Sequence, residues 1–150
     1  MTLDTSAIIA ILFAEPGYLE IVDRILEAEH VRVGAPTLVE ANLVFTGRRG
    51  GHAGREVEEL VKELAITVVP FGEAEWHRAS EAFGRYGRGR HKAALNFGDC
   101  LSYATATVAD DLLLFVGNDF TRKGGPELCA AMKQLPEAHL TIVSRSEEHT

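Results

Sequence analysis

Four acidic residues of this chain lie in apolar or turn surroundings, where a carboxylate needs a partner or has chemistry to do. They are Asp4, Glu40, Asp99 and Asp119. A buried carboxylate is costly unless it is paired, hydrogen-bonded or bound to a metal ion. Carboxylate oxygens are also the ligands that hard cations such as Mg²⁺ prefer. Four of them, far apart in the sequence, therefore indicate a cation site with oxygen ligands that is assembled by the fold.

Each acid also has a purely structural interpretation. Asp4 and Asp99 could each cap a helix, and Asp119 could belong to a turn beside Asn118. Glu40 could be a solvated helix position, although its helix is apolar on nearly every side. Because such a helix is normally buried, we expect Glu40 to have a buried partner. The four acids together favour a site, since four separate structural explanations would otherwise have to hold.

The elements that must position these acids alternate between strands and helices. A short strand ends at Asp4, and a continuous apolar run at Leu112–Val116 predicts a central strand covered on both faces. The other expected strands are Val31–Val33, Ile66–Val69 and Leu140–Val143. Helices are expected over Ala7–Leu12, Leu19–Ala28, Pro36 to about Gly50, Val57–Leu64, Glu73–Tyr86, Asp99–Val108 and from Pro126 through Met132.

This order predicts an α/β fold of three layers, with a mostly parallel sheet of four to five strands and helices on both faces. In such sheets ligands bind beyond the carboxyl ends of the strands. Asp4 and Asp119 each follow a strand, so both should project at that edge. We expect one domain over residues 1–143. Residues 144–150 form a polar tail, for which disorder or a cloning-derived origin are the two interpretations.

The composition argues against several classes of protein. The chain has 150 residues, of which 46% are hydrophobic and 25% charged, and no apolar run reaches the length of a membrane helix. We expect a cytoplasmic protein with reduced core thiols at Cys100 and Cys129, and neither a secretory leader nor a membrane partner. A net charge of −7 argues against a protein that coats nucleic acid through its overall field.

Several segments together resemble the PIN-domain ribonucleases, and most closely the toxins of VapBC toxin–antitoxin pairs. Order and spacing match from Met1 to Val143. The segments are Leu3-Asp4-Thr5-Ser6-Ala7, the helix around Glu40, Leu95-Asn96-Phe97-Gly98-Asp99-Cys100-Leu101-Ser102-Tyr103-Ala104 and Leu114-Phe115-Val116-Gly117-Asn118-Asp119-Phe120. Thr2 is a departure, because an apolar residue is usual there, and we expect it to affect strand packing rather than chemistry.

The resemblance implies a metal-dependent endoribonuclease that acts as a toxin and uses Mg²⁺, with Mn²⁺ able to substitute. Asp4, Glu40, Asp99 and Asp119 match the acidic quartet of the family, and we assign Asp4 and Asp99 as the central ligands. Thr5 or Ser6 matches the hydroxyl beside the first acid, and Asn118 is a supporting residue. The implied reaction is hydrolysis of single-stranded or looped RNA that leaves a 5′-phosphate. A homodimer and a cognate VapB-like antitoxin are also implied.

A basic segment precedes Asp99 and could hold RNA phosphates or acidic groups of the antitoxin, or could be a solvated loop. Its cationic residues are Arg85, Arg88, Arg90 and Lys92. Binding of RNA through them would depend on salt, and Tyr86 could stack on a base. Trp76 is expected in the core or at a dimer face.

Three other functions are compatible with parts of the pattern. A haloacid dehalogenase-type phosphatase also has an Asp after its first strand, but its second Asp would fall at Ser6. A non-catalytic PIN-like RNA-binding or scaffold module would be expected to have lost acids that this chain retains. A DNA nuclease could use the same quartet. The sequence does not specify the RNA target, the cleavage position or the number of metal ions.

Overall fold

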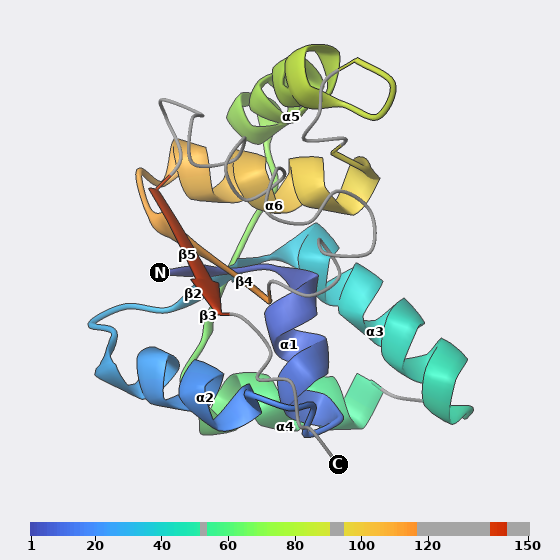
Figure 1. The fold of residues 1–150 in the computed structure, drawn as a ribbon, viewed down its shortest axis with the longest axis vertical. Coiled ribbons are helices and arrows are strands. Elements are labelled where there is room, and N and C mark those ends of the chain that lie inside the picture. The colour runs from blue at the N-terminus through green and yellow to red at the C-terminus, as the bar shows by residue number, and fades with distance from the viewer. Residues whose placement is uncertain (52–53, 91–94, 117–138, 144–150) are drawn as a thin grey trace.

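A computed structural model of the chain describes residues 1–51, 54–90, 95–116 and 139–143. Its centre is a five-stranded sheet in which all neighbours are parallel (Figure 1). The strand order is β3-β2-β1-β4-β5. The strands are β1 (Thr2–Leu3), β2 (Arg32–Gly34), β3 (Thr67–Val69), β4 (Leu112–Val116) and β5 (His139–Val143). The predicted α/β class and parallel sheet are therefore confirmed.

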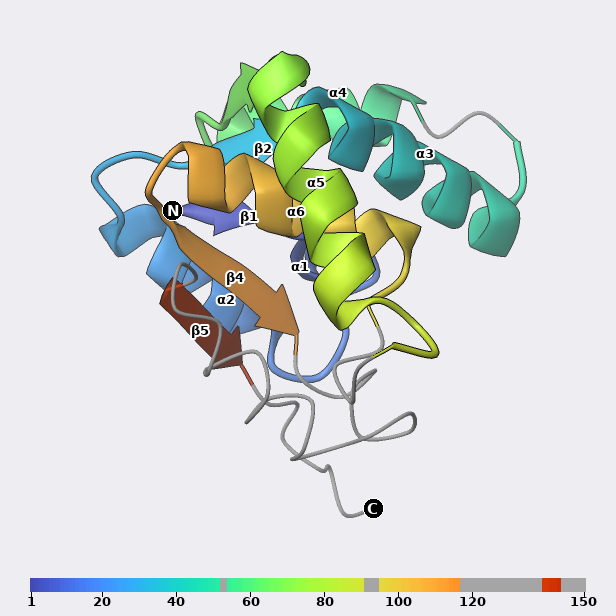
Figure 2. The ribbon, with the colours of Figure 1, turned by 90° about the horizontal axis from the view of Figure 1, so that it is seen from above.

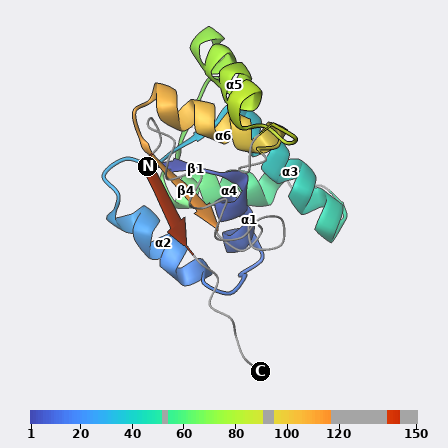
Figure 3. The same ribbon diagram turned by 45° about the horizontal axis from the view of Figure 1, so that its top comes forward.

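Helices cover both faces of the sheet, as the alternating pattern predicts. One side carries α5 and α6, with α5 crossing over α6, and the other carries α1, α2 and α4 (Figures 1 and 2). The third helix, α3, runs along the side of the molecule between these layers (Figure 3). The helices are α1 (Thr5–Leu12), α2 (Tyr18–Glu27), α3 (Ala35–Arg49), α4 (Gly54–Glu63), α5 (Glu73–Tyr86) and α6 (Phe97–Val108).

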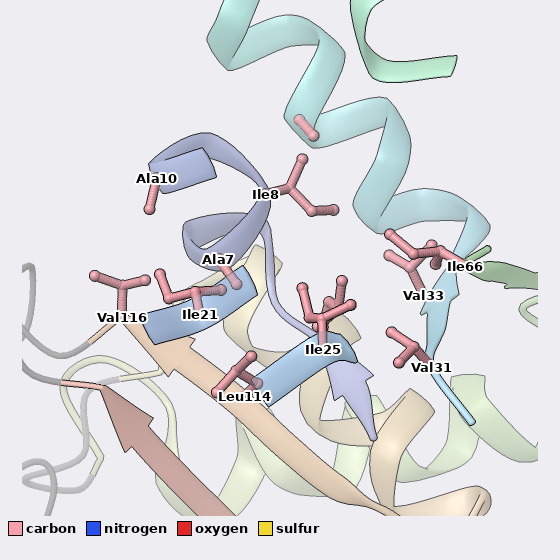
Figure 4. Close-up of a cluster of buried hydrophobic side chains, with 12 residues drawn as sticks. Ala7, Ile8, Ala10, Ile21, Ile25, Val31, Val33, Ile66, Leu114 and Val116 are labelled. Carbon is pink, nitrogen blue, oxygen red and sulfur yellow. The ribbon is translucent and has the colours of Figure 1, made fainter. Parts of the chain in front are cut away.

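Strand β4 shows why the apolar run forms a central strand. Successive side chains of a strand point to opposite faces. Leu114 and Val116 pack with α1 and α2 (Figure 4), whereas Leu113 and Phe115 pack under α5 and α6. All four are at most 2% exposed. The strand thus joins two cores, which is why it has no polar alternation.

The observed elements follow the predicted ones to within a few residues, and α5 and β4 have the predicted bounds. One boundary differs in a way that matters for the site. Asn96, not Asp99, is the N-cap of α6, and Asp99 lies in the first turn. Cys100 is buried in the core as predicted, and this burial, with the Asp99 charge beside it, raises the pKa of its thiol to about 11. Cys129 and the helix expected from Pro126 lie outside the described residues.

The strand order places a switch point between β1 and β4. The chain builds the sheet outward from β1 to β3, then returns and adds β4 on the other side of β1. Ligands of open α/β sheets bind at such a point, beyond the carboxyl ends of the two strands. Asp4 immediately follows β1 and therefore lies there.

A charged cluster links the amino-terminal ends of β1, β2 and β4, opposite the switch point. The sequence did not reveal this cluster. Asp111 accepts hydrogen bonds from the hydroxyl of Thr2 at 2.9 Å and from Arg32 at 3.1 Å. The amino group of Met1 lies 2.8 Å from the same carboxylate. Thr2 is fully buried, so its hydroxyl, unusual at this position, serves as a partner for Asp111. That this departure affects strand packing rather than chemistry stays a prediction.

The cluster around Asp111 leads to a prediction about stability. Burial alone would raise the pKa of the Asp111 carboxyl, but the amino terminus, Thr2 and Arg32 outweigh it and lower that pKa. An acid with a lowered pKa stabilises the fold above its unfolded pKa of about 3.9, and the stabilisation is lost as the pH falls through the folded value. We expect Asp111→Asn to lower the free energy of unfolding at pH 7 by about 1–3 kcal/mol, measured by urea denaturation.

Asp110→Asn is the matched control. Asp110 is exposed and has a φ of +50°, a conformation that Asn tolerates well. The unfolding free energy of the Asp110→Asn protein should stay within about 0.5 kcal/mol of the wild-type value. An Asp111→Asn protein that is as stable as Asp110→Asn at pH 7 would show that the cluster does not hold the strands.

Candidate active site

Two hydrogen bonds join the carboxyl end of β4 to the residues at the start of α1, which directly follow β1. The amide of Asp4 donates to the carbonyl of Leu114 at 3.1 Å, and the amide of Val116 donates to the hydroxyl of Ser6 at 3.1 Å. The side chain of Asp4 caps α1 by accepting from the amide of Ser6 at 3.0 Å. Asp4 is thereby fixed at the switch point by backbone and side chain together.

The carboxylate of Asp4 is 5% exposed and has a second donor from α6. The hydroxyl of Ser102 donates to its Oδ1 at 2.6 Å, and Thr37 Oγ1 lies 3.5 Å from the same hydroxyl. Burial raises the pKa of the Asp4 carboxyl, although hydrogen bonds from Ser102 and Ser6 oppose the rise. Hydrogen bonds thus stabilise the charged form of Asp4, whereas its burial destabilises that form.

Glu40 has a partner on α1. The hydroxyl of Thr5 donates to Glu40 Oε1, so the two hydroxyls beside Asp4 have different roles: Thr5 contacts a carboxylate, and Ser6 ties β4 to α1. Thr5 is buried, so the expectation that Glu40 has a buried partner is confirmed. The helix that carries Glu40 is nevertheless not buried on every side. Val39 and Leu43 are 58% and 69% exposed, because only the other side of α3 packs on the core.

Gly98 provides the second contact of Glu40. An ideal Cβ at Gly98 would lie 2.7 Å from both Cδ and Oε1 of Glu40, and closer still to Oε2. The carboxylate therefore lies directly against the backbone of α6 at Gly98. Any residue larger than glycine at this position would clash with it. Since Asp99 follows Gly98, this contact brings the Glu40 side chain next to the part of the chain that carries Asp99.

Asp99 lies in the first turn of α6 and is half-buried. Its Oδ2 accepts from the amide of Asn96 at 3.0 Å, and its own amide donates to Asn96 Oδ1 at 2.8 Å. This reciprocal pair is a capping box. Asp99 therefore has the helix-capping role considered from the sequence, but as the third helical residue and not as the cap itself.

The structure thus gathers Asp4, Glu40 and Asp99 on three elements that meet: the starts of α1 and α6, and the first half of α3 (Figure 3). Asp119 and Asn118 lie outside the described residues. Within the described part of the chain, no three His, Cys, Asp or Glu side chains form a group that could hold a metal. Each of the three carboxylates instead has its own hydrogen-bond partner.

The chemistry of these donors nevertheless suits a hard cation. The three side chains offer only oxygen atoms, which is the preference of Mg²⁺. Among the described residues, no Lys, Arg or His forms an ion pair with Asp4 or Glu40. A cation at this position would therefore find oxygen donors and no competing positive side chain among the described residues.

Comparison with known proteins identifies the family. The PIN domain profile matches residues 1–126. The ribonuclease VapC36 of Mycobacterium tuberculosis is 43% identical over 121 residues, which cover 80% of this chain and 87% of that protein. This chain belongs to the VapC branch of the PIN-domain family.

Two solved structures have the same fold. A crystal structure of VapBC2 from Rickettsia felis, bound to a DNA fragment from its promoter, superposes with a TM-score of 0.63 at 11% identity. It covers 94% of this chain and 96% of that one. A toxin–antitoxin complex from Klebsiella pneumoniae gives a TM-score of 0.60 at 16% identity and covers 97% and 98% of the two chains. At these identities the likeness concerns the PIN fold alone.

The basic segment of this PIN domain is partly described. Arg85, Arg88 and Arg90 are exposed, and Arg85 pairs with Glu81 at 3.3 Å. Lys92 lies outside the described residues. Tyr86 is half-buried against the core under α5 and α6, so it faces the protein more than the solvent. Trp76 is 58% exposed and stacks on His77, so it does not lie in the core. The other expected place for it, a dimer face, stays a prediction.

Sequence reasoning missed three residues of this PIN-domain site: Ser102, Thr37 and Gly98. Ser102 is a fully buried hydroxyl in an apolar helix, three residues after Asp99, and that polar interruption is the signal that could have revealed it. Thr37 and Gly98 gave no such signal. Their roles depend on contacts between helices that are distant in sequence.

The contact of Glu40 with Gly98 predicts a specific coupling. Gly98→Ala should force the Glu40 carboxylate away from α6 and break its hydrogen bond with Thr5. We expect the free energy of unfolding to fall by about 1–2 kcal/mol. A Glu40→Ala background removes the three atoms nearest to the new methyl group, so the same change should be neutral or stabilising by up to about 1 kcal/mol, as Gly→Ala in a helix usually is.

Gly84→Ala in α5 is the control, because an added Cβ there has no atom within 4 Å. It should give the same small gain in stability in the wild-type chain and in the Glu40→Ala background. Urea denaturation of the four combinations at positions 98 and 40 measures the coupling. Equal effects of Gly98→Ala in both backgrounds would contradict the contact.

Proposed function

We propose that this chain is a Mg²⁺-dependent endoribonuclease and the toxin of a type II toxin–antitoxin pair. The observation that carries the proposal is the buried carboxylate of Asp4, fixed at the switch point of the sheet beside the elements that bear Glu40 and Asp99. The relative VapC36 is named a ribonuclease and is 43% identical over most of its length. We assign RNA cleavage to this chain on the site and the relative together, and a cytoplasmic setting belongs to the same proposal.

Asp4, Glu40, Asp99 and Asp119 would hold Mg²⁺, or Mn²⁺ in its place. When bound, the ion would lower the pKa of a water molecule and neutralise charge on the phosphate during hydrolysis of an RNA phosphodiester. All four side chains are carboxylates, which suits an ion that requires oxygen ligands.

The residues around the acids keep them in position. Ser102 and the amide of Ser6 hold the two oxygens of Asp4, so this carboxylate has one fixed orientation. Thr5 holds Glu40 against Gly98. Such preorganisation matters because a charged group that does not have to reorient lowers the barrier more than a mobile one.

The phosphatase alternative is disfavoured by the position of Ser6. A haloacid dehalogenase-type enzyme requires a second acid there, whereas the Ser6 hydroxyl accepts the Val116 amide and links β4 to α1. The non-catalytic alternative is disfavoured because Asp4, Glu40 and Asp99 all remain and lie on elements that meet.

A cognate antitoxin is part of the same proposal, since both structural neighbours are toxin–antitoxin complexes. The chemistry of the site suggests how an antitoxin tail would inhibit. A cationic side chain, above all Arg, could lie beside Asp4 and Glu40, which form no ion pair with another described residue, and so replace the charge of the ion.

The metal site predicts opposite effects on stability and activity. In chelator, Asp99→Asn should melt no lower than wild type, because it relieves repulsion between neighbouring carboxylates and keeps an acceptor for the Asn96 amide. With Mg²⁺ or Mn²⁺ it should lose RNA cleavage by ~100-fold or more and gain less stability from the metal than wild type. Thermal melts and cleavage of a fluorescent single-stranded RNA measure both.

Asp110→Asn is again the control and should behave as wild type in both assays. Wild-type cleavage by Asp99→Asn in the presence of metal would show that the active site is assigned wrongly. Lower melting in chelator without loss of cleavage would show that Asp99 serves only as the helix-capping residue.

We also propose a homodimer, formed through the exposed apolar side of α3. Val39 and Leu43 are one helical turn apart and both exposed. Light scattering at micromolar concentration should give about twice the chain mass of 16.3 kDa, and Leu43→Glu should give monomers. Leu26→Glu on α2 is the control, since Leu26 is 67% exposed on another helix. A wild-type mass of one chain would rule out the dimer.

A further inference from the structure

Phe97 is an exposed aromatic residue that neither the core nor the acidic site explains. It is the first residue of α6 and is 76% exposed, more than any other large apolar side chain among the described residues. Its neighbour Gly98 is buried against Glu40, and Asp99 follows. A phenyl ring therefore stands in solvent two residues from a carboxylate of the proposed active site.

Backbone hydrogen bonds join the basic segment to Leu95, two residues before Phe97. The amide of Leu95 donates to the carbonyl of Tyr86 at 2.9 Å, and the amide of Arg88 donates to the carbonyl of Leu95 at 3.1 Å. The end of α5 and the start of α6 consequently lie side by side (Figure 2). Arg88, which forms part of this junction, is exposed, and so are Arg85 and Arg90.

An exposed aromatic ring two residues from Leu95, to which a segment with exposed arginines is hydrogen-bonded, in a chain with a net charge of −7, matches one class of ligand better than others. Single-stranded nucleic acids are bound by cations that follow the phosphates and by aromatic rings on which bases stack. A base in a duplex is already stacked on both sides and offers no free face. The ring of Phe97 is open to solvent and so accessible to an unpaired base.

We propose that Phe97 is a base-stacking subsite for the RNA substrate, where an unpaired base next to the scissile phosphate lies on the phenyl ring while Arg85, Arg88 and Arg90 contact neighbouring phosphates. The proposal rests on the proposed ribonuclease function. It deepens that function by naming the residue on which an unpaired base of the substrate would stack at the cleavage position. Phe97 takes the role that the sequence had offered to Tyr86, whose ring is half-buried.

Binding without cleavage tests the subsite. A fluorescein-labelled single-stranded RNA of about twelve nucleotides, near the upper end of known single-strand site sizes, is titrated with the full chain in chelator, and its anisotropy is followed. We expect Phe97→Ala to weaken binding roughly 5- to 100-fold, the range for loss of one stacked base. Phe97→Trp should retain or improve affinity. Binding of duplex RNA of the same sequence should be unchanged by Phe97→Ala.

Salt dependence separates stacking from charge. Phe97→Ala should leave the slope of log affinity against log salt unchanged, whereas Arg88→Gln should reduce it by about one. Trp76→Ala is the control for an exposed aromatic residue elsewhere on α5 and should bind RNA as wild type does. The melting temperature of Phe97→Ala should equal that of wild type, since an exposed ring contributes little to folding.

Two outcomes would overturn the proposal. If Phe97→Ala binds single-stranded RNA as tightly as wild type while Arg88→Gln binds it less tightly, RNA binding stands but the subsite does not exist. If Phe97→Ala changes only the dimer mass or the affinity for an antitoxin peptide, the ring belongs to a protein interface. Failure of the wild-type chain to bind or cleave any RNA would instead remove the proposed function itself.

Discussion

The described part of the site depends on how one buried carboxylate is held. Asp4 directly follows β1, caps α1, donates its amide to a carbonyl of β4 and accepts a hydrogen bond from the Ser102 hydroxyl of α6. Hydrogen bonds alone do not remove the cost of burying its charge, because its pKa is still raised. A cation beside the carboxylate would stabilise that charge. The same position that suits a metal ligand is therefore also the point where sheet and helices are joined.

Helix α6 has the largest share in shaping this site. Ser102 holds Asp4, the bare backbone at Gly98 makes room for Glu40, and Asp99 completes the capping box with Asn96. All of these helix residues lie within two turns of its start. The position of α6 is itself fixed by the core residues of β4 beneath it. Core packing and site geometry are thus set by the same helix, so a change that shifts α6 should disturb both.

The sequence predicted what local patterns determine. The apolar run of β4 and the periodicity of α5 predicted their bounds, and three of the four acids proved to lie on elements that meet. It did not predict contacts between distant residues. Nothing near Glu40 reveals Thr5 as its partner, and nothing near Thr2 reveals Asp111. Apolar residues around Glu40 suggested a buried helix, yet Val39 and Leu43 are exposed, because composition does not tell on which side the core lies.

The charges around the site set a requirement for any anionic substrate. The carboxylates at the switch point would repel a phosphodiester, so binding must be supported from elsewhere until a cation neutralises them. The exposed arginines near the joined ends of α5 and α6 provide attraction that does not depend on the metal. Attraction by charge alone, however, does not distinguish one nucleotide position from another. Discrimination must come from groups that contact bases, and among the described residues beside the acids the exposed ring of Phe97 is suited to that role.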